Sequence, residues 1–324
     1  MNILGIETSC DETAAAVVRD GHEVLSNVVY TQISLHVPYG GVVPEIASRA
    51  HVEKISEVVR TAISQFESAA PGKRLDAVAV TYGPGLSPAL LVGLNAAKGL
   101  ALSLGVPLVA INHLEAHLHT PFLHDSGDTP TDGAGAVPTP ADLMPALGLV
   151  ISGGHTNWID MPVYGEYRTI GHTLDDAAGE AFDKAAKLLG LGYPGGPKID
   201  KMAKDFFASH PGRPDLVAFP KGRPREGVSA LAGLPAELCV SFSGLKTALL
   251  RYVQQNADID VPRVVASYQE AIVGAVADRT RTALRRGRYN ALVVGGGVSL
   301  NSRLRSALEA VAGEAGVRLM VAKP

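Results

Sequence analysis

The chain has 324 residues, of which 46% are hydrophobic and 19% charged, and its formal net charge is −3. This composition excludes an intrinsically disordered chain and is typical of a globular protein long enough for two domains, each with its own core. A net charge so close to zero gives no overall attraction to nucleic acid, so any such binding must be local.

The cysteine content and the N-terminal residues indicate the cellular compartment in which we expect the protein. Cys10 and Cys239 are too few for a disulfide framework, and residues 1–5 lead directly into an expected strand with no charged leader. We therefore expect a cytoplasmic location. No apolar run reaches the roughly 18 residues of a membrane span, because glycines and polar residues interrupt residues 90–104, so we expect no membrane insertion.

The first predicted elements are two short strands, residues 2–8 and 13–18, joined by a polar turn that carries Asp11 and Glu12. Such a hairpin tip can face the phosphates and metal of a nucleotide, although a plain exposed turn is the more frequent outcome. A loop at residues 32–41 then precedes a helix over residues 47–66.

A strand at residues 75–81 is followed by a Gly/Pro turn at residues 82–87, which opens a helix that ends near Leu104. A strand, a glycine turn and a helix N-terminus together can bind an anion. The Walker lysine and the complete G-x-G-x-x-G pattern are absent, and the glycines fit close helix packing equally well.

Two histidines follow a predicted buried parallel strand at residues 107–111. His113 and His117 are four residues apart, so on a helix both imidazoles can reach one metal ion from the same face. The alternative is two partly exposed histidines with no ligand. Glu115 is separated from His113 by about 200° of helix rotation, so the general base of an H-E-x-x-H zinc protease is missing.

The composition then shifts to Pro, Gly, Asp and Thr, and it predicts three parts: a first α/β lobe (1–123), a connection (124–144) and a second α/β lobe (145–324). Strands at residues 147–151 and 157–161, with a turn at 152–156, repeat the pattern that opens the first lobe. This repetition indicates a duplicated architecture, and we expect the two turns to face each other across a cleft.

The remaining elements are helices and two strands. Residues 175–189 predict a helix with acids in its first turn, ended by the glycine-rich stop at residues 190–197. Further helices are expected from residue 241 and over residues 262–286, strands over 291–294 and 317–321, and a glycine turn at 295–301 whose backbone can contact a nucleotide directly. The basic end of helix 262–286, with Arg281, Arg285 and Arg288, is either a solvated face or a nucleic-acid patch.

Several of these segments together closely resemble the tRNA N6-adenosine threonylcarbamoyltransferase family of the TsaD type, once described as O-sialoglycoprotein endopeptidases. The resemblance runs in order from residue 2 to residue 324, and the segments at 5–13 and 175–197 resemble the bacterial or organellar branch of the family. The segments that carry it are GIETSCDET (5–13), HLEAH (113–117), SGGHT (152–156), the block at 175–197, SFSGLKT (241–247) and GGGVSLN (295–301).

The resemblance implies the two-lobed fold of actin, Hsp70 and sugar kinases, and transfer of a threonylcarbamoyl group from threonylcarbamoyl-AMP to N6 of the adenosine beside the anticodon, in tRNAs that read codons beginning with A. It implies that His113 and His117 bind a divalent metal, iron(II) or zinc, and that Asp11 and Glu12 lie in the same cleft as catalytic candidates. It also implies two protein partners, an inactive paralogue and a small ATPase, and a set of substrate-binding positions: Val150, Ile151, Ser152, Gly153, Gly154, Asp183, Gly196, Asp200 and Asn301.

One departure from the family pattern concerns the metal. The family's third protein ligand is an aspartate just after the last strand, where this sequence stops, so we expect a truncated sequence.

The alternatives to the transferase function are a non-catalytic assembly partner of the same fold, a small-molecule kinase or a metalloprotease. The histidine pair counts against the kinase, because kinases of this fold use magnesium held by carboxylates and water.

Overall fold

The computed structural model describes residues 1–125, 138–212, 215–224 and 233–322. The chain divides into two compact units, Met1–Val137 and Pro138–Pro324. Most of the expected connection at residues 124–144 lies outside the described residues.

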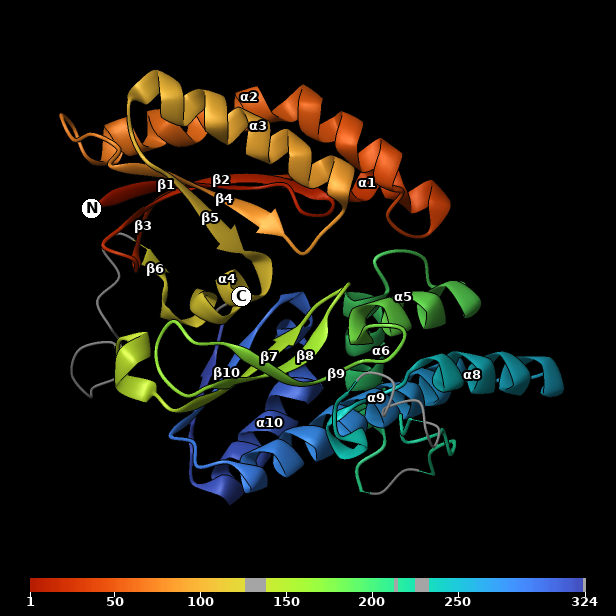
Figure 1. Ribbon diagram of the computed structural model, residues 1–324. Coiled ribbons are helices and arrows are strands. Elements are labelled where there is room, and N and C mark those ends of the chain that lie inside the picture. The colour runs from red at the N-terminus through yellow and green to blue at the C-terminus, as the bar shows by residue number, and fades with distance from the viewer. Residues whose placement is uncertain (126–137, 213–214, 225–232, 323–324) are drawn as a thin grey trace. The chain divides into compact units, whose positions relative to one another are not determined.

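The first unit is built on a mixed six-stranded sheet (Figure 1). Its strands are β1 (Asn2–Glu7), β2 (Glu12–Arg19), β3 (Glu23–Thr31), β4 (Ala77–Gly83), β5 (Leu108–Asn112) and β6 (His124–Asp125). They lie in the order β5-β4-β1-β2-β3-β6, with β1 antiparallel to β2 and parallel to β4. The carboxyl ends of β1, β4 and β5 therefore meet at one edge of the sheet, as in other parallel arrangements.

Helices cover one face of this sheet (Figure 1). Leu4 and Ile6 alternate along β1 and pack with apolar residues of α2, which recur at helical spacing from Ile55 to Phe66. The helical segments of the unit are α1 (Ile33–His36), η1 (Val37–Tyr39), α2 (Pro44–Ala69), α3 (Ser87–Leu104), α4 (His113–His119) and η2 (Thr120–Phe122).

The second unit repeats the strand plan of the first. Its strands are β7 (Ala146–Ile151), β8 (Thr156–Met161), β9 (Arg168–His172), β10 (Ala291–Gly295) and β11 (Arg318–Val321), in the order β11-β10-β7-β8-β9. As β1 does in the first sheet, β7 pairs antiparallel with the next strand in sequence and parallel with a later one. The duplication predicted from the two strand-turn-strand patterns is confirmed.

The helical segments of the second unit are η3 (Pro140–Leu143), α5 (Ala178–Leu188), α6 (Gly195–Ser209), η4 (Ala236–Leu238), α8 (Ser243–Gln255), α9 (Val261–Arg286), η5 (Gly297–Leu300) and α10 (Ser302–Ala315). Helix α9 is buried on nearly all sides of its first half and lies at the centre of the core. The fully buried Trp158 of β8 donates from Nε1 to Thr280 Oγ1 of α9 at 2.9 Å, which satisfies its only polar atom.

Three local expectations are wrong. Strand β5 is parallel, as predicted, but among the described strands it lies at the edge of the sheet, and Leu108 and Val109 are exposed, so the expected burial is wrong. The expected glycine stop at residues 190–197 instead contains the start of α6. The helix tolerates Pro197 because the first turn has no internal N–H bonds to lose.

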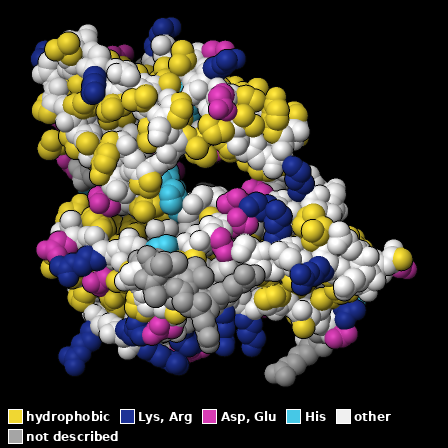
Figure 2. Space-filling model, turned by 45° about the vertical axis from the view of Figure 1, so that its right-hand side comes forward, with side chains coloured by type: hydrophobic (Ala, Val, Ile, Leu, Met, Phe, Trp, Pro, Cys, Tyr) yellow, Lys and Arg dark blue, Asp and Glu magenta, His cyan; other side chains and the backbone are white. Residues whose placement is uncertain are grey.

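The third correction concerns α3, which is long and apolar enough to cross a membrane by length and composition alone. Its Asn95 and Lys98 do not interrupt the apolar character enough to fail that test. In this structure α3 connects β4 to β5, packs against α2 and the sheet, and buries Ala89, Gly93, Ala97 and Ala101, so it is a helix of an α/β unit. Figure 2 shows apolar side chains (yellow) at the surface of the unit that contains it.

Candidate active site

The two histidines of α4 converge as their spacing predicts. His113 and His117 lie with their Nε2 atoms 3.1 Å apart and their ring planes at 74°. Two nitrogens bound at about 2.0–2.1 Å to one metal lie roughly 2.9 Å apart at an octahedral angle and roughly 3.3 Å apart at a tetrahedral one. The observed separation falls between these values, so the pair fits a shared metal ion. Among the described residues, no group of three or more His, Cys, Asp or Glu side chains could hold a metal.

Glu7, at the end of β1, contacts the far side of the His113 ring. Its Oε2 lies 3.2 Å from His113 Nδ1 and accepts a hydrogen bond from Thr81 Oγ1 at 2.6 Å. Burial alone would raise the pKa of the Glu7 carboxyl, but hydrogen bonds and the charge of His113, together with hydrogen bonds from Ser9 and Thr81, lower it to about 2. Glu7 is therefore a carboxylate at neutral pH. Sequence reasoning missed this residue because 106 positions separate it from His113.

The turn after β1 is held against the start of α3. The backbone N–H of Leu86 donates to Ser9 O at 2.8 Å, and a Cβ atom at Gly85 would come within 2.7 Å of that same oxygen. A Cβ atom at Gly93 would lie 2.4 Å from Thr8 Oγ1. Close packing therefore explains Gly85 of the Gly/Pro turn, and it also explains Gly93 within α3.

Asp11 lies in the turn between β1 and β2, as predicted, and Glu12 is the first residue of β2. The carbonyl of Asp11 accepts a hydrogen bond from the Gln32 N–H at 3.0 Å, which ties the turn to the segment before α1. Desolvation, together with the negative charges of Asp11 and Glu7, raises the pKa of the Glu12 carboxyl. A carboxylate with a raised pKa is a better proton acceptor than an ordinary one.

In the second unit, the turn between β7 and β8 closes on itself. Ser152 N–H donates to His155 O at 2.8 Å, and His155 N–H donates to Ser152 Oγ at 3.1 Å. The N-terminus of α5 joins this turn, because Gly179 N–H donates to Ser152 O at 3.2 Å. Val150 and Ile151 are fully buried, so neither residue is exposed to a ligand in this structure.

The other predicted substrate-binding residues of this unit lie at helix N-termini, as Gly196 and Asn301 do, or contact them from within a helix, as Asp183 and Asp200 do. Asp183 Oδ1 accepts from the Gly195 N–H at 2.6 Å, next to Gly196 at the start of α6. Asp200 accepts from the Ser302 N–H at 3.1 Å and from its hydroxyl at 2.9 Å. Asn301 caps α10 by accepting from Leu304 N–H and donates to Gln269 Oε1 at 2.8 Å. The structure thus brings the starts of α6 and α10 together through Asp200.

The glycines around these termini fall into two groups. Gly296 has a φ of +97°, and a Cβ atom there would lie 2.4 Å from Ile151 O, so close backbone approach requires it. A Cβ atom at Gly153, Gly154, Gly196 or Gly297 would meet no atom within 4 Å. These four positions border open space. Within the described part of the chain, Ser299 Oγ in η5 is the buried side-chain polar atom that lacks a hydrogen-bond partner.

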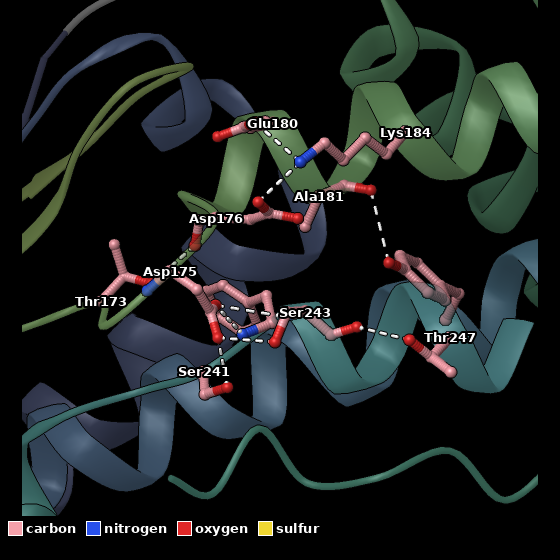
Figure 3. A network of polar contacts seen from close by, with 11 residues as sticks. Thr173, Asp175, Asp176, Glu180, Ala181, Lys184, Ser241, Ser243 and Thr247 are labelled. Carbon is pink, nitrogen blue, oxygen red and sulfur yellow. Dashed lines mark hydrogen bonds and ion pairs between the residues drawn. The ribbon is translucent and has the colours of Figure 1, made fainter. Parts of the chain in front are cut away.

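Asp175 has a different role from the one predicted for it (Figure 3). It precedes α5, and its carboxylate accepts hydrogen bonds from the hydroxyls of Ser241 and Ser243 at 2.5 and 2.7 Å and from the N–H groups of Phe242 and Ser243. Its neighbour Asp176 pairs with Lys184 of α5 at 2.6 Å. Asp175 therefore holds the start of α8, and the prediction that it lies in the first turn of its own helix is wrong, because that helix begins at Ala178.

The basic end of α9 is divided between structure and surface. Arg279 is buried and donates to the carbonyls of Cys239 and Gly222. Arg281 pairs with Glu314 at 2.7 Å and with Asp278 at 3.0 Å, whereas Arg285 and Arg288 are exposed. Arg286 is exposed as well, but its charge is paired with Glu237. Arg285 and Arg288 therefore retain the exposure that binding to nucleic acid needs.

Comparison with known proteins decides the family. Residues 23–324 match the family model described as TsaD, tRNA N6-adenosine threonylcarbamoyltransferase. The chain belongs to the tRNA N6-adenosine threonylcarbamoyltransferase family. A family member from Anaeromyxobacter dehalogenans (strain 2CP-C) is 51% identical over 315 residues, which cover 96% of this chain and 85% of that protein. One from Clostridium perfringens (strain SM101 / Type A) is 43% identical, over 99% of this chain and 87% of that protein.

Solved structures show the same fold at low sequence identity. Full-length HypF in its phosphate- and nucleotide-bound form aligns with a TM-score of 0.60 at 10% identity, over 99% of this chain and 43% of that one. Component A of the Acidaminococcus fermentans (R)-2-hydroxyglutaryl-CoA dehydratase aligns with a TM-score of 0.51 at 15% identity, over 99% of this chain and 91% of that one. The predicted fold class, that of actin, Hsp70 and sugar kinases, is confirmed. Membership of the threonylcarbamoyltransferase family shows that the protein is a transferase.

Proposed function

We propose that this family member transfers the threonylcarbamoyl group of threonylcarbamoyl-AMP to N6 of the adenosine beside the anticodon, in tRNAs that read codons beginning with A. The N6 nitrogen forms a bond to the carbamoyl carbon, the bond from that carbon to the phosphate oxygen breaks, AMP leaves, and N6 loses one proton. The observation that carries the proposal is the convergence of the His113 and His117 Nε2 atoms in a chain of this family.

His113 and His117 would hold one divalent metal, iron(II) or zinc. Imidazole nitrogens suit both ions, and the 3.1 Å separation of the Nε2 atoms fits their common coordination. When bound, the metal would supply positive charge for an oxygen anion of the substrate. The two imidazoles fill only part of a coordination shell, which leaves positions for oxygen ligands and substrate.

We place the adenylate on the second unit, at the starts of α5, α6 and α10. Two observations support this. Gly153, Gly154, Gly196 and Gly297 border open space, so a ligand can lie directly on their backbone. The hydroxyl of Ser299 is buried with no partner, and a buried polar atom of this kind is usually satisfied by a ligand, ion or water.

The chain's own residues would position the reactants and accept the N6 proton. A carboxylate at the turn between β1 and β2 is the proton acceptor we favour, and Glu12 is preferred over Asp11 because its pKa is raised. The leaving group, AMP, is already good, so the main task of the protein is to hold the N6 nitrogen and the carbonyl carbon in reacting geometry.

The proposal includes a cytoplasmic location and two protein partners, which are an inactive paralogue of the same family and a small ATPase. The surface of helix α3 supports binding to the paralogue. Leu91 and Leu102, three turns apart on one side of the helix, are 55% and 85% exposed. Exposed apolar side chains on one helix face are typical of a protein-binding surface.

The experiment is incorporation of labelled threonine into tRNA. The adenylate-forming enzyme and both partners are supplied, and two tRNAs are compared that differ only in the base beside the anticodon, adenine or guanine. The proposal predicts incorporation into the adenine tRNA alone. Equal incorporation into both, or none in either with all components folded, would contradict it.

A further inference from the structure

We propose that Glu7 is a positioning residue for the metal site, which fixes the tautomer and the ring plane of His113 so that its Nε2 lone pair points at the metal. This inference rests on the proposed function of the histidine pair as metal ligands. It adds a residue from another strand, at the far side of the ring from the metal.

The carboxylate of Glu7 is itself held at both oxygens. Oε1 accepts a hydrogen bond from the Ser9 N–H, and Oε2 accepts one from Thr81 Oγ1 at 2.6 Å. Ser9 belongs to the turn after β1 and Thr81 to β4, so the two donors come from two neighbouring parts of the first unit. The carboxylate therefore presents Oε2 to the His113 ring from a fixed place.

This hydrogen bond selects one tautomer of His113. A carboxylate can only accept, so at 3.2 Å from Oε2 the Nδ1 atom must carry a hydrogen. A bare Nδ1 would set two lone pairs against each other. Ser9 Oγ also lies 3.2 Å from Nδ1 and can share that hydrogen as a second acceptor. With the hydrogen on Nδ1, the Nε2 of a neutral His113 is left with the lone pair that a metal needs.

The geometry reproduces the arrangement in which a carboxylate orients a metal-binding histidine from behind. Such partners make the ring a stronger ligand, and their loss typically weakens metal binding about 10- to 100-fold. His113 and Glu7 have side-chain exposures of 16% and 32%, so solvent reaches the pair only in part. Water therefore replaces the carboxylate poorly when it is removed.

The informative substitution is Glu7→Gln, which removes the charge and keeps the size. The Ser9 N–H is a fixed donor, so the glutamine oxygen should turn to it and leave the NH2 group facing His113 Nδ1. The ring would then carry its hydrogen on Nε2, where it blocks the metal. Glu115→Gln is the matched control, because it makes the same chemical change two residues from His113 without touching the ring's Nδ1.

The probes are Co²⁺ and Zn²⁺, titrated against a chromophoric chelator in the full protein, and the tautomer of His113 is read from ¹⁵N shifts of the metal-free protein. We expect Glu7→Gln to weaken metal binding about 10- to 100-fold and to move the hydrogen of His113 from Nδ1 to Nε2, with Glu115→Gln like wild type. Glu7→Asp, which keeps the charge but withdraws it from the ring, should also weaken binding and replaces Glu7→Gln if that variant does not fold.

Two results would overturn the inference. Metal affinity within twofold of wild type in the folded Glu7 variants would do so, and so would an unchanged Nδ1–H tautomer in Glu7→Gln. His113→Ala separates this failure from that of the proposed function. If His113→Ala loses the metal and the Glu7 variants keep it, only the positioning role is wrong, whereas if His113→Ala also keeps it, the histidine pair is not the metal site.

Discussion

Asp175 accepts two hydrogen bonds from Ser243, one from its backbone N–H at 3.1 Å and one from its hydroxyl at 2.7 Å. The carboxylate thus caps α8 from a segment 68 residues away in sequence. Loss of a helix cap costs about 0.5–2 kcal/mol. We expect Asp175→Ala to lower the free energy of unfolding of the second unit by about 1–2 kcal/mol, measured by urea denaturation, with Asp205→Ala on the exposed side of α6 as control. An unchanged midpoint for Asp175→Ala would show that the cap contributes nothing.

The same carboxylate predicts a dependence of stability on pH. Burial would raise the pKa of Asp175, but hydrogen bonds from Ser241, Ser243 and Phe242 lower it below its usual value. A lowered pKa in the folded state means that the contribution is fully present above about pH 4, the unfolded value, and is lost as pH falls through the folded value. The stability difference between wild type and Asp175→Asn should therefore shrink as the pH is lowered from about 5 to about 2 in denaturation curves. A constant difference would contradict this.

The histidine pair and Asp175 show what the sequence can and cannot predict. Spacing on a single helix determines that His113 and His117 share a face, so their convergence was predictable. Asp175 was misassigned because acids before a helix usually serve that helix, and nothing local reveals a partner such as Ser243. Helix α6 was missed because Gly195 and Pro197 are typical of loops. Gly195 is required there by close packing, since a Cβ atom would lie 2.7 Å from Phe182 O.

Gly296 and Gly297 are neighbours that should respond differently to substitution. Gly296→Ala places a Cβ atom 2.4 Å from Ile151 O at a φ of +97°, so it should destabilise the fold by about 1–3 kcal/mol. Gly297→Ala meets no atom within 4 Å and should fold normally, yet bind the adenylate more weakly because its methyl group occupies the ligand's place. Calorimetric titration with a non-hydrolysable adenylate analogue tests this. Wild-type affinity in Gly297→Ala would remove the proposed adenylate position from η5.

Arg285, near the end of α9, and Arg288, just after it, are the exposed arginines that we test as a nucleic-acid patch. Replacing both by alanine should weaken tRNA binding and reduce the dependence of log Kd on log salt by about 1 for each phosphate that the two side chains neutralise. Arg281→Ala should have a smaller effect, because Glu314 and Asp278 already balance its charge. Filter binding at several salt concentrations measures both quantities. Identical slopes for wild type and the double variant would mean that the two arginines form a solvated face only.

The central claim is that His113 and His117 act as one unit in threonylcarbamoyl transfer. The most direct measurement is the rate of labelled threonine incorporation into tRNA by wild type, His113→Ala, His117→Ala and the double variant, with partners and adenylate supplied. Because a shared metal needs both imidazoles, each single variant should lose most activity and the double variant should be little worse than either. Glu115→Gln should stay close to wild type. Folded single variants that keep wild-type turnover, or losses that simply multiply in the double variant, would contradict the claim.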